Sequence, residues 1–353
     1  MAKRIDLLNL TPDELTEQVV AWGQPAYRGG QIWGWLYRHL IQDVDEMGNL
    51  PRALRQRLAD ETFIGGLEAV HTALAEDGLT EKVVLRAPDG QLLEAVLMRY
   101  DERYTVCVSS QIGCAIGCPF CATGQAGWVR DLTVGEIIVQ ILYFARRLRN
   151  EGAAVSNVVF MGMGEPMANY EAVWRAIRIL HDPAGLGLGA RRFTLSTAGI
   201  VPGIERMAGE NLEVGLAISL HAPDDELRDR LVPLNRRYPL EPLMAAVREY
   251  IARTGRRVTF EYALAQEVND TPDQARRTAR LLHGLLCHVN LIPLNPTAGS
   301  GYEASSRDRV LRFQEILTRA GIPTTVRLRR GIEIAAGCGQ LRGRYATQER
   351  EER

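Results

Sequence analysis

A repeated alternation of strand-like and helix-like segments is the feature that most constrains the fold of this chain. From about residue 105 onward, short apolar runs alternate with longer stretches of helical periodicity. Because parallel strands need crossover connections, six such units predict an α/β fold with a partial (β/α)6 barrel, whose functional residues should follow the strands. The expected strands are Thr105–Ser109, Val158–Met161, Phe193–Ser196, Val214–Leu220, Val258–Leu264 and Val289–Leu294. The expected helices include Val134–Leu148, Tyr170–Leu180 and Gln274–Leu286.

The barrel is expected to occupy residues 105–345, preceded by two smaller segments. Residues 1–65 should form a helical domain, because Thr11-Pro12-Asp13-Glu14 is a capping box followed by helical apolar spacing. Residues 66–104 have a period of two around the turn Pro88-Asp89-Gly90, which predicts a β-hairpin extension. A further strand is expected at Thr324–Leu328, and residues 346–353 should be a charged tail.

Three cysteines follow the first expected barrel strand with the spacing C-x3-C-x2-C. They are Cys114, Cys118 and Cys121. Three close thiolates can hold three irons of a [4Fe–4S] cubane and leave the fourth iron open. The open iron chelates the amino and carboxylate groups of S-adenosylmethionine, and an electron from the cluster cleaves the S–C5′ bond to release a 5′-deoxyadenosyl radical. The motif therefore predicts a radical S-adenosylmethionine enzyme.

Two other interpretations of these cysteines are less favoured. Cys118 and Cys121 alone could be a redox pair, and the three together could be part of a zinc site. Zinc takes a fourth ligand, and no second C-x2-C or pair of histidines lies near the motif in the sequence. The spacing, with Phe120 before the last cysteine, favours the cluster.

Charge and composition indicate an ordinary globular protein. The formal net charge is −1, so overall charge does not point to nucleic acid. Basic residues are almost all arginine, and arginine pairs that converge on one face would bind RNA phosphates, although each pair alone fits a solvated surface. No signal peptide or membrane span is visible, so we expect a cytoplasmic protein without membrane contact. In that reducing compartment, six cysteines suggest metal binding or catalysis before disulfides.

Several motifs resemble those of the RlmN/Cfr family of radical S-adenosylmethionine RNA adenine methyltransferases, and most closely its RlmN branch. The resemblance covers nearly the whole chain and includes the N-terminal helical domain, which in this family is an accessory RNA-binding domain. The motifs are Cys107-Val-Ser-Ser-Gln-Ile-Gly-Cys114, Phe160-Met-Gly-Met-Gly-Glu165-Pro-Met, Ser219-Leu-His221-Ala-Pro, Asn290-Leu-Ile-Pro-Leu-Asn295-Pro and Cys338-Gly-Gln-Leu.

The resemblance implies roles for three residues outside the cluster motif. Cys338 would carry the transferred methyl group as S-methylcysteine, Cys107 would resolve the product by forming a disulfide, and Glu94 would be the general base. Without the resemblance, Cys107 looks like a core residue and Glu94 like a solvated strand residue. The contacts implied for S-adenosylmethionine are Gly164, Glu165, Ser196, Ser219, Leu220, His221 and Asn295.

Two further sequence features lead to expectations about structure. Gly337 stands where the family more often has alanine, which should affect the flexibility of the Cys338 loop more than its chemistry. Cys287 should be a buried structural thiol at the end of an apolar helix.

The function implied by the resemblance is methylation of adenosine C2 in 23S rRNA and tRNA, with two molecules of S-adenosylmethionine per turnover. An electron donor such as flavodoxin or ferredoxin would reduce the cluster. The alternatives are C8 methylation of the same rRNA adenosine, as in the antibiotic-resistance branch, radical chemistry on a small molecule or peptide, and a non-catalytic iron–sulfur or zinc protein that binds RNA. Gly164-Glu165-Pro166 and the segment Asn235–Pro239 resemble the C2 branch.

Overall fold

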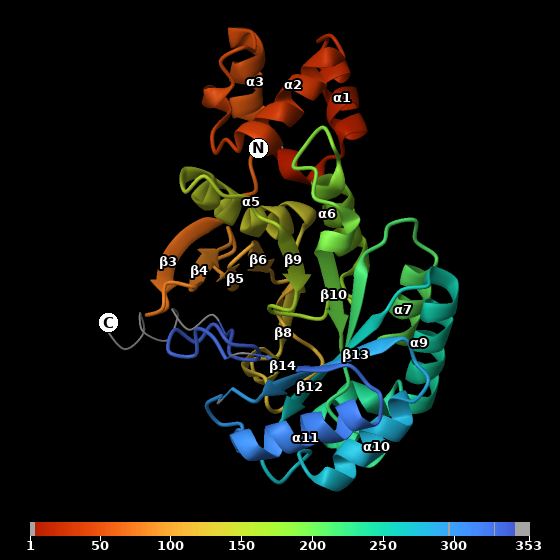
Figure 1. Ribbon diagram of the computed structural model, residues 1–353. Coiled ribbons are helices and arrows are strands. Elements are labelled where there is room, and N and C mark those ends of the chain that lie inside the picture. The colour runs from red at the N-terminus through yellow and green to blue at the C-terminus, as the bar shows by residue number, and fades with distance from the viewer. Residues whose placement is uncertain (1–3, 296, 328, 343–353) are drawn as a thin grey trace.

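A ten-stranded sheet forms the centre of the computed structural model, which describes residues 4–295, 297–327 and 329–342 (Figure 1). Its strand order is β14-β13-β12-β11-β10-β9-β6-β5-β4-β3. All pairs from β6 to β14 are parallel, which confirms the partial barrel. These strands are β6 (Arg103–Cys107), β9 (Asn157–Phe160), β10 (Phe193–Thr197), β11 (Gly215–Ser219), β12 (Val258–Leu264), β13 (Cys287–Pro293) and β14 (Thr324–Val326).

Helices connect consecutive parallel strands and cover the outside of the sheet (Figure 1). Thr133 and Thr271 form capping boxes at the starts of α5 and α10. The helix α5 begins at the predicted Val134, whereas α10 begins at Pro272, before the predicted Gln274. The barrel helices are α5 (Val134–Asn150), α6 (Tyr170–His181), α7 (Val201–Ala208), α8 (Asp225–Leu231), α9 (Leu240–Thr254), α10 (Pro272–Leu282) and α11 (Arg307–Arg319). Shorter elements are β7 (Gln111–Gly113), α4 (Ala122–Gln125), β8 (Trp128–Asp131), η4 (Ala190–Arg192) and η5 (Pro233–Arg236).

The end of α10 differs from the sequence expectation. The helix ends at Leu282, Gly284 takes a φ of 76°, and Cys287 opens β13 instead of closing a helix. Leu285 and Leu286 continue the apolar run through this turn, which makes the helix seem longer in the sequence. Cys287 is buried, as expected, and burial raises the pKa of its thiol to about 11. The predicted ends of the last strand, at Leu328, and of the chain, at 346–353, lie outside the described residues.

The segment before the barrel extends the barrel sheet and is more than a separate hairpin. β4 (Thr80–Arg86) and β5 (Leu92–Tyr100) form the predicted hairpin, and β5 then pairs antiparallel with β6. A third strand, β3 (Glu68–Leu74), pairs with the far edge of β4. Most of β3 is exposed, and the predicted hairpin did not include it as a third strand.

The N-terminal module is helical and lies on the outer helices α5 and α6 (Figure 1). Arg146 and Arg149 of α5 donate hydrogen bonds to the carbonyls of Leu40 and His39, at 2.6 and 2.7 Å. The predicted capping box at Thr11 is present. The module consists of β1 (Ile5–Asp6), η1 (Leu7–Asn9), α1 (Pro12–Ala21), α2 (Tyr27–Gly34), the π-helical turn η2 (Trp35–His39), η3 (Val44–Glu46), α3 (Arg52–Glu61) and β2 (Thr62–Phe63). None of the helices in the described ranges has the length and apolar character needed to cross a bilayer.

Candidate active site

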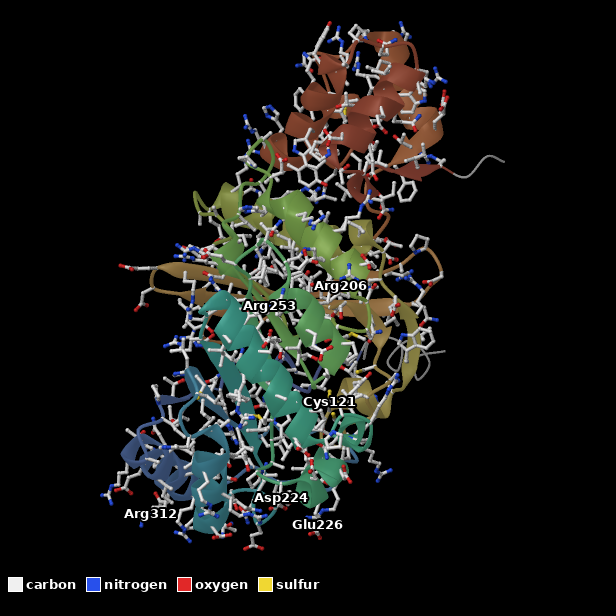
Figure 2. The ribbon with its side chains drawn as sticks, turned by 90° about the vertical axis from the view of Figure 1, so that its right-hand side faces the viewer. Cys121, Arg206, Asp224, Glu226, Arg253 and Arg312 are labelled. Carbon is white, nitrogen blue, oxygen red and sulfur yellow. The ribbon has the colours of Figure 1, made fainter. Side chains whose placement is uncertain are left out.

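A cavity of about 930 Å³ opens at the carboxyl ends of the parallel strands, as the barrel prediction requires. Figure 2 shows Cys121 on the side of the barrel away from Arg206 and Arg253, which lie in the last turns of α7 and α9. The cavity is lined by the cysteine motif, by the loops that follow β9, β10, β11 and β13, and by side chains of the strands themselves, among them Glu261 and Ala263 of β12.

The three cysteines of the motif line this cavity together as free thiols. Burial raises the pKa of Cys114 to about 12, and burial together with the charges of Cys121 and Cys114 raises the pKa of Cys118 well above its usual value. Buried thiolates therefore need a strong positive partner, which the irons of a cluster supply. No group of three or more His, Cys, Asp or Glu side chains in the described ranges is spaced for a single metal ion. Cubane cysteines bind separate irons, so this donor set fits the cluster.

Glu165 presents a buried carboxylate to the cavity. Its oxygens accept hydrogen bonds from the backbone of Met167 at 3.0 Å and of Ala198 at 2.7 Å, and burial raises its pKa to about 6. The loop that carries it depends on Gly164, whose φ is 100° and whose added Cβ would lie 2.6 Å from the Cβ of Gln111. A carboxylate fixed in this way suits the ammonium group of S-adenosylmethionine.

The carboxyl ends of β10 and β11 bring Ser196 and Ser219 to the same cavity, and the loop after β11 adds His221. His221 has a φ of 59°, and its Nδ1 accepts a hydrogen bond from the backbone of Ala263 at 3.0 Å. Burial lowers the pKa of His221 to about 3, so the ring is neutral and carries its proton on Nε2. Leu220, by contrast, does not line the cavity: it is fully buried behind it and donates its N–H to the carbonyl of Glu261.

Asn295 lies between the main cavity and the Cys338 loop. Its Nδ2 donates to the carbonyl of Cys338 at 3.1 Å, while its buried Oδ1 has no hydrogen-bond partner among the described residues. That oxygen is available to a ligand in the cavity. A Cβ added to Gly337 would lie 2.5 Å from Asn295 Nδ2 and 2.7 Å from Gln340 Oε1. The glycine therefore allows the loop to approach these two amides closely, whereas the sequence predicts an effect on the flexibility of the loop.

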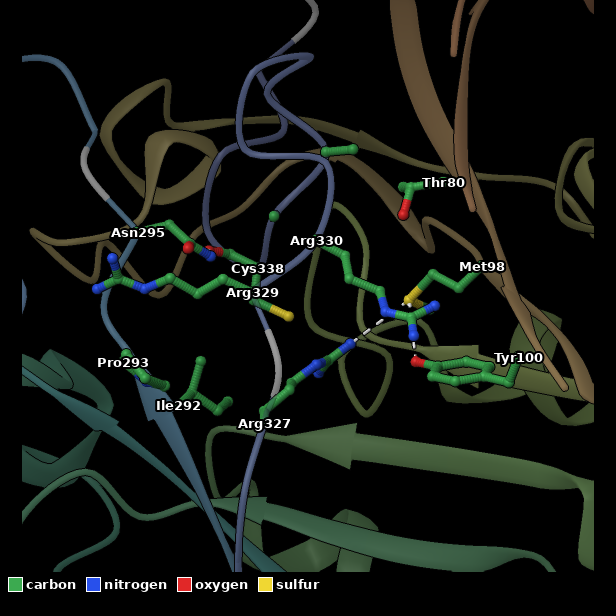
Figure 3. Close-up of a pocket in the computed structure, with 12 residues that line it drawn as sticks. Thr80, Met98, Tyr100, Ile292, Pro293, Asn295, Arg327, Arg329, Arg330 and Cys338 are labelled. Carbon is green, nitrogen blue, oxygen red and sulfur yellow. Dashed lines mark hydrogen bonds between the residues drawn. The ribbon is translucent and has the colours of Figure 1, made fainter. Parts of the chain in front are cut away.

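Cys107 and Cys338, far apart in the sequence, line one smaller cavity together with Arg327. Both are free thiols, so the two cysteines are not joined by a disulfide in this structure. Burial, reinforced by the charge of Cys338, raises the pKa of Cys107 to about 12, and the Arg327 cation opposes this rise. Figure 3 shows Arg329 beside Asn295 and Cys338, with Arg327 and Arg330 directed toward Met98 and Tyr100.

Glu94 is buried, so the interpretation of this residue as a solvated strand residue is wrong. In the sheet, Val96 of β5 pairs with Lys82 of β4 on one side and with Cys107 of β6 on the other. Glu94 lies two residues before Val96 on β5. Lys82, Glu94 and Cys107 therefore share one face of the sheet. Glu94 Oε1 accepts a hydrogen bond from the backbone of Arg342 at 3.3 Å, so the chain just after Cys338 covers this face.

The sequence did not predict two side chains that organise the site. Arg228 of α8 is completely buried and donates to the carbonyls of Ala198, Ser219 and Leu220 at 2.6 to 3.1 Å. Its other partner is Asn235 Oδ1 at 2.8 Å, within the segment that resembles the C2 branch. The second is Lys82, whose Nζ lies 3.3 Å from Glu94 Oε2. A lone arginine in a polar helix gives no sequence signal, but Lys82 is one of only two lysines in an arginine-rich chain.

Most of the arginine pairs do not gather at the site. Arg329 and Arg330 line a pocket beside Cys338, whereas Arg191, Arg276 and Arg277 form surface ion pairs with acidic side chains. A convergent phosphate-binding face is therefore supported only around the pair next to Cys338.

Comparison with known proteins agrees with this site. The model described as "Radical SAM superfamily" matches residues 108–282, which hold the three cysteines and the loops after β9, β10 and β11. The fold and site thus define a radical S-adenosylmethionine enzyme, whose cofactors are a [4Fe–4S] cluster and S-adenosylmethionine. The model described as "Ribosomal RNA large subunit methyltransferase N-terminal domain" matches residues 5–64.

Similarity over nearly the full length narrows the class. The chain is 54% identical to a probable dual-specificity RNA methyltransferase RlmN of Chloroflexus aurantiacus, over 94% of this chain and 91% of that one. It is 50% identical to the protein of the same description in Moorella thermoacetica, over 99% of both. A crystal structure of a radical SAM methyltransferase from Sphaerobacter thermophilus is 53% identical, with a TM-score of 0.95 over 96% of this chain and 99% of that one. The chain belongs to the RlmN family of radical S-adenosylmethionine methyltransferases.

Proposed function

We propose that this enzyme methylates C2 of adenosine in 23S rRNA and in tRNA, with Cys338 as the methyl carrier. The observation that carries the proposal is the arrangement of two cysteines outside the cluster motif. Cys338 lines both the large cavity and the small cavity that contains Cys107. The relatives in Chloroflexus and Moorella are described as dual-specificity RNA methyltransferases, which supports two kinds of RNA as substrates.

The chemistry of the target explains why such a carrier is needed. Adenine C2 lies between two ring nitrogens and is too electron-poor to attack a sulfonium methyl group, whereas a carbon radical adds to it. When bound, the cluster and S-adenosylmethionine supply the 5′-deoxyadenosyl radical and, from a second molecule, the methyl group. We propose that Glu165, Asn295 and the loops of Ser196, Ser219 and His221 hold S-adenosylmethionine in the cavity.

The residues of this chain then act in order. Cys338 Sγ takes a methyl group by displacement and, after loss of one hydrogen atom from that methyl, its methylene carbon bonds to adenine C2. The adduct then loses the C2 ring proton to Glu94 and one electron, which the oxidised cluster would accept when bound, so that the ring becomes aromatic again. The Cys107 thiolate attacks Cys338 Sγ, and the sulfur–methylene bond breaks as a disulfide forms. The electron pair of that bond stays on the methylene carbon, which takes up a proton and becomes the methyl group. A small electron carrier such as flavodoxin or ferredoxin would reduce the cluster.

Nucleoside mass spectrometry tests this proposal. The reconstituted enzyme is incubated without oxygen with a 23S rRNA fragment and with tRNA, and Cys338→Ala is the control. We expect 2-methyladenosine from both RNAs and none from the control. A product containing only 8-methyladenosine would establish the C8 alternative, and modification of one RNA alone would restrict the specificity to it.

A further inference from the structure

Lys82 is a buried lysine at the junction between the sheet extension and the Cys338 loop. It lies on β4, and its side chain is 8% exposed. A buried ammonium group is costly unless it is paired. Since nearly every other basic residue of this chain is arginine, a lysine at this position indicates a need for a small cation.

The contacts of Lys82 connect two parts of the proposed reaction. Its Nζ lies 3.3 Å from Glu94 Oε2 and donates to the carbonyl of Ala335, three residues before Cys338, at 3.4 Å. Ala335 has a φ of 50°, a conformation that is costly for a residue with a side chain. Lys82 therefore binds the loop at its strained point while it holds the carboxylate of the proposed base.

The surroundings leave Lys82 as the cation closest to this carboxylate among the ion pairs of the described residues. Cys107 on β6 and the backbone of Arg342 face Glu94 from the other sides. The neighbouring Glu81 is paired with Arg99 and Arg147, and successive residues of a strand point to opposite faces. Loss of Lys82 would therefore remove the charge partner of a buried carboxylate together with the contact that ties it to the Cys338 loop.

We propose that Lys82 is a positioning residue for methyl transfer: its ammonium group pairs with the Glu94 carboxylate and fixes that base relative to the loop that carries Cys338. The inference rests on the proposed function and adds to it a residue that acts through Glu94. It predicts a defect in the step that removes the ring proton, after the methylene carbon has bonded to the RNA and before the product is released.

The test compares Lys82→Met with Lys82→Arg, which keeps the charge, and with wild type. Three quantities are measured: S-methylation of Cys338 by protein mass spectrometry, cleavage of S-adenosylmethionine, and covalent protein–RNA adduct on denaturing gels. Lys82→Met should keep the first two within about twofold of wild type and accumulate adduct, because the base is no longer held in place. Lys82→Arg, which can keep the ion pair, should accumulate less adduct than Lys82→Met and restore part of the product release.

Each other outcome overturns the inference. Release by Lys82→Met at the wild-type rate, or an equal defect in Lys82→Arg, would show that Glu94 does not need this cation. Loss of Cys338 methylation together with release would assign Lys82 a purely structural role. If Lys82→Met fails to assemble the cluster, Lys82→Gln takes its place, and wild-type release by that variant would contradict the proposal. A wild-type enzyme that methylates Cys338 but never RNA would refute the proposed function itself, and the role of Lys82 with it.

Discussion

Cys107 and Cys338 come from different elements, β6 and the C-terminal loop, and line one cavity although they are distant in the sequence. Cys107 is buried, and burial raises its pKa to about 12, so its thiolate is scarce at neutral pH. A thiol in this state is protected from adventitious oxidation and reacts mainly with a partner placed next to it. Its position next to Cys338 is therefore as important to the proposed disulfide step as its chemistry.

Replacement of Cys107 should stop the reaction at the covalent stage. In Cys107→Ala nothing attacks Cys338 Sγ, so the methylene bridge to RNA should persist while cluster assembly and cleavage of S-adenosylmethionine continue. A denaturing gel with labelled RNA should show a shifted band for Cys107→Ala and none for Cys338→Ala, which lacks the methyl carrier. Normal turnover by Cys107→Ala without a shifted band would leave Cys107 as a core residue only.

Glu165 should make the binding of S-adenosylmethionine depend on pH. Burial raises the pKa of this carboxyl to about 6, so at lower pH it becomes neutral and loses its attraction for the ammonium group of the ligand. Affinity should be constant above pH 7 and fall by up to about tenfold per unit below pH 6. Equilibrium dialysis between pH 5 and 8 measures the affinity for S-adenosylmethionine, and cluster absorbance is checked at each pH. Glu165→Gln should bind weakly, without this pH dependence, and a flat wild-type profile would exclude the proposed pairing.

At the scale of elements, the buried side chain of Arg228 connects the loops that carry the proposed ligand contacts. Its guanidinium joins α8 to the ends of β10 and β11 through three carbonyls. Ala198, one of its partners, also donates a hydrogen bond to Glu165. The position of the Glu165 carboxylate therefore depends on a helix two strands further along the sheet.

Removal of this guanidinium should weaken both the fold and the site. Arg228→Met removes the buried charged hydrogen bonds to three carbonyls and to Asn235 Oδ1, which should lower the free energy of unfolding by about 3 kcal/mol or more. We also expect weaker binding of S-adenosylmethionine, because the Ala198 loop loses its support. Arg230→Met, an exposed position on the same helix, is the matched control. Thermal unfolding and dialysis measure the two effects, and equal behaviour of the two variants would contradict the structural role assigned to Arg228.

The sequence predicts the barrel better than it predicts the face behind Cys338. β12 has the predicted bounds because it is a buried, largely apolar run. The motif cysteines could be assigned to one site because they lie within a few residues of one another in the sequence. The environment of Glu94 could not be predicted, because it depends on the register of β4, β5 and β6 and on a loop more than 200 residues later. Leu220 shows the opposite case, since its motif lines the cavity while its own side chain points away.

At the scale of the whole molecule, two additions to the barrel have different positions relative to the site. The N-terminal module lies on α5 and α6 and is held by arginine side chains that bind its backbone carbonyls. The extension β3–β5 continues the sheet and places Lys82 and Glu94 next to Cys107. The extension therefore contributes Lys82 and Glu94 to the proposed reaction centre, whereas the module contacts the outer helices α5 and α6.

Binding of RNA by this molecule should depend on a few local charges, because its formal net charge is only −1. Arg329 and Arg330 line the pocket beside Cys338, and the target adenosine must reach that cysteine with its phosphates. Each phosphate contact adds about 0.7 to 0.9 to the slope of log affinity against log salt, so replacing both arginines by glutamine should reduce the slope by about 1 to 2.

Fluorescence anisotropy with tRNA between about 50 and 300 mM salt, a range chosen so that screening changes markedly, measures the slope. The matched control is Arg276→Gln with Arg277→Gln, a pair engaged in surface ion pairs on α10, which should leave the slope unchanged. If both double variants behave alike, the phosphates nearest the target adenosine contact another surface of the protein.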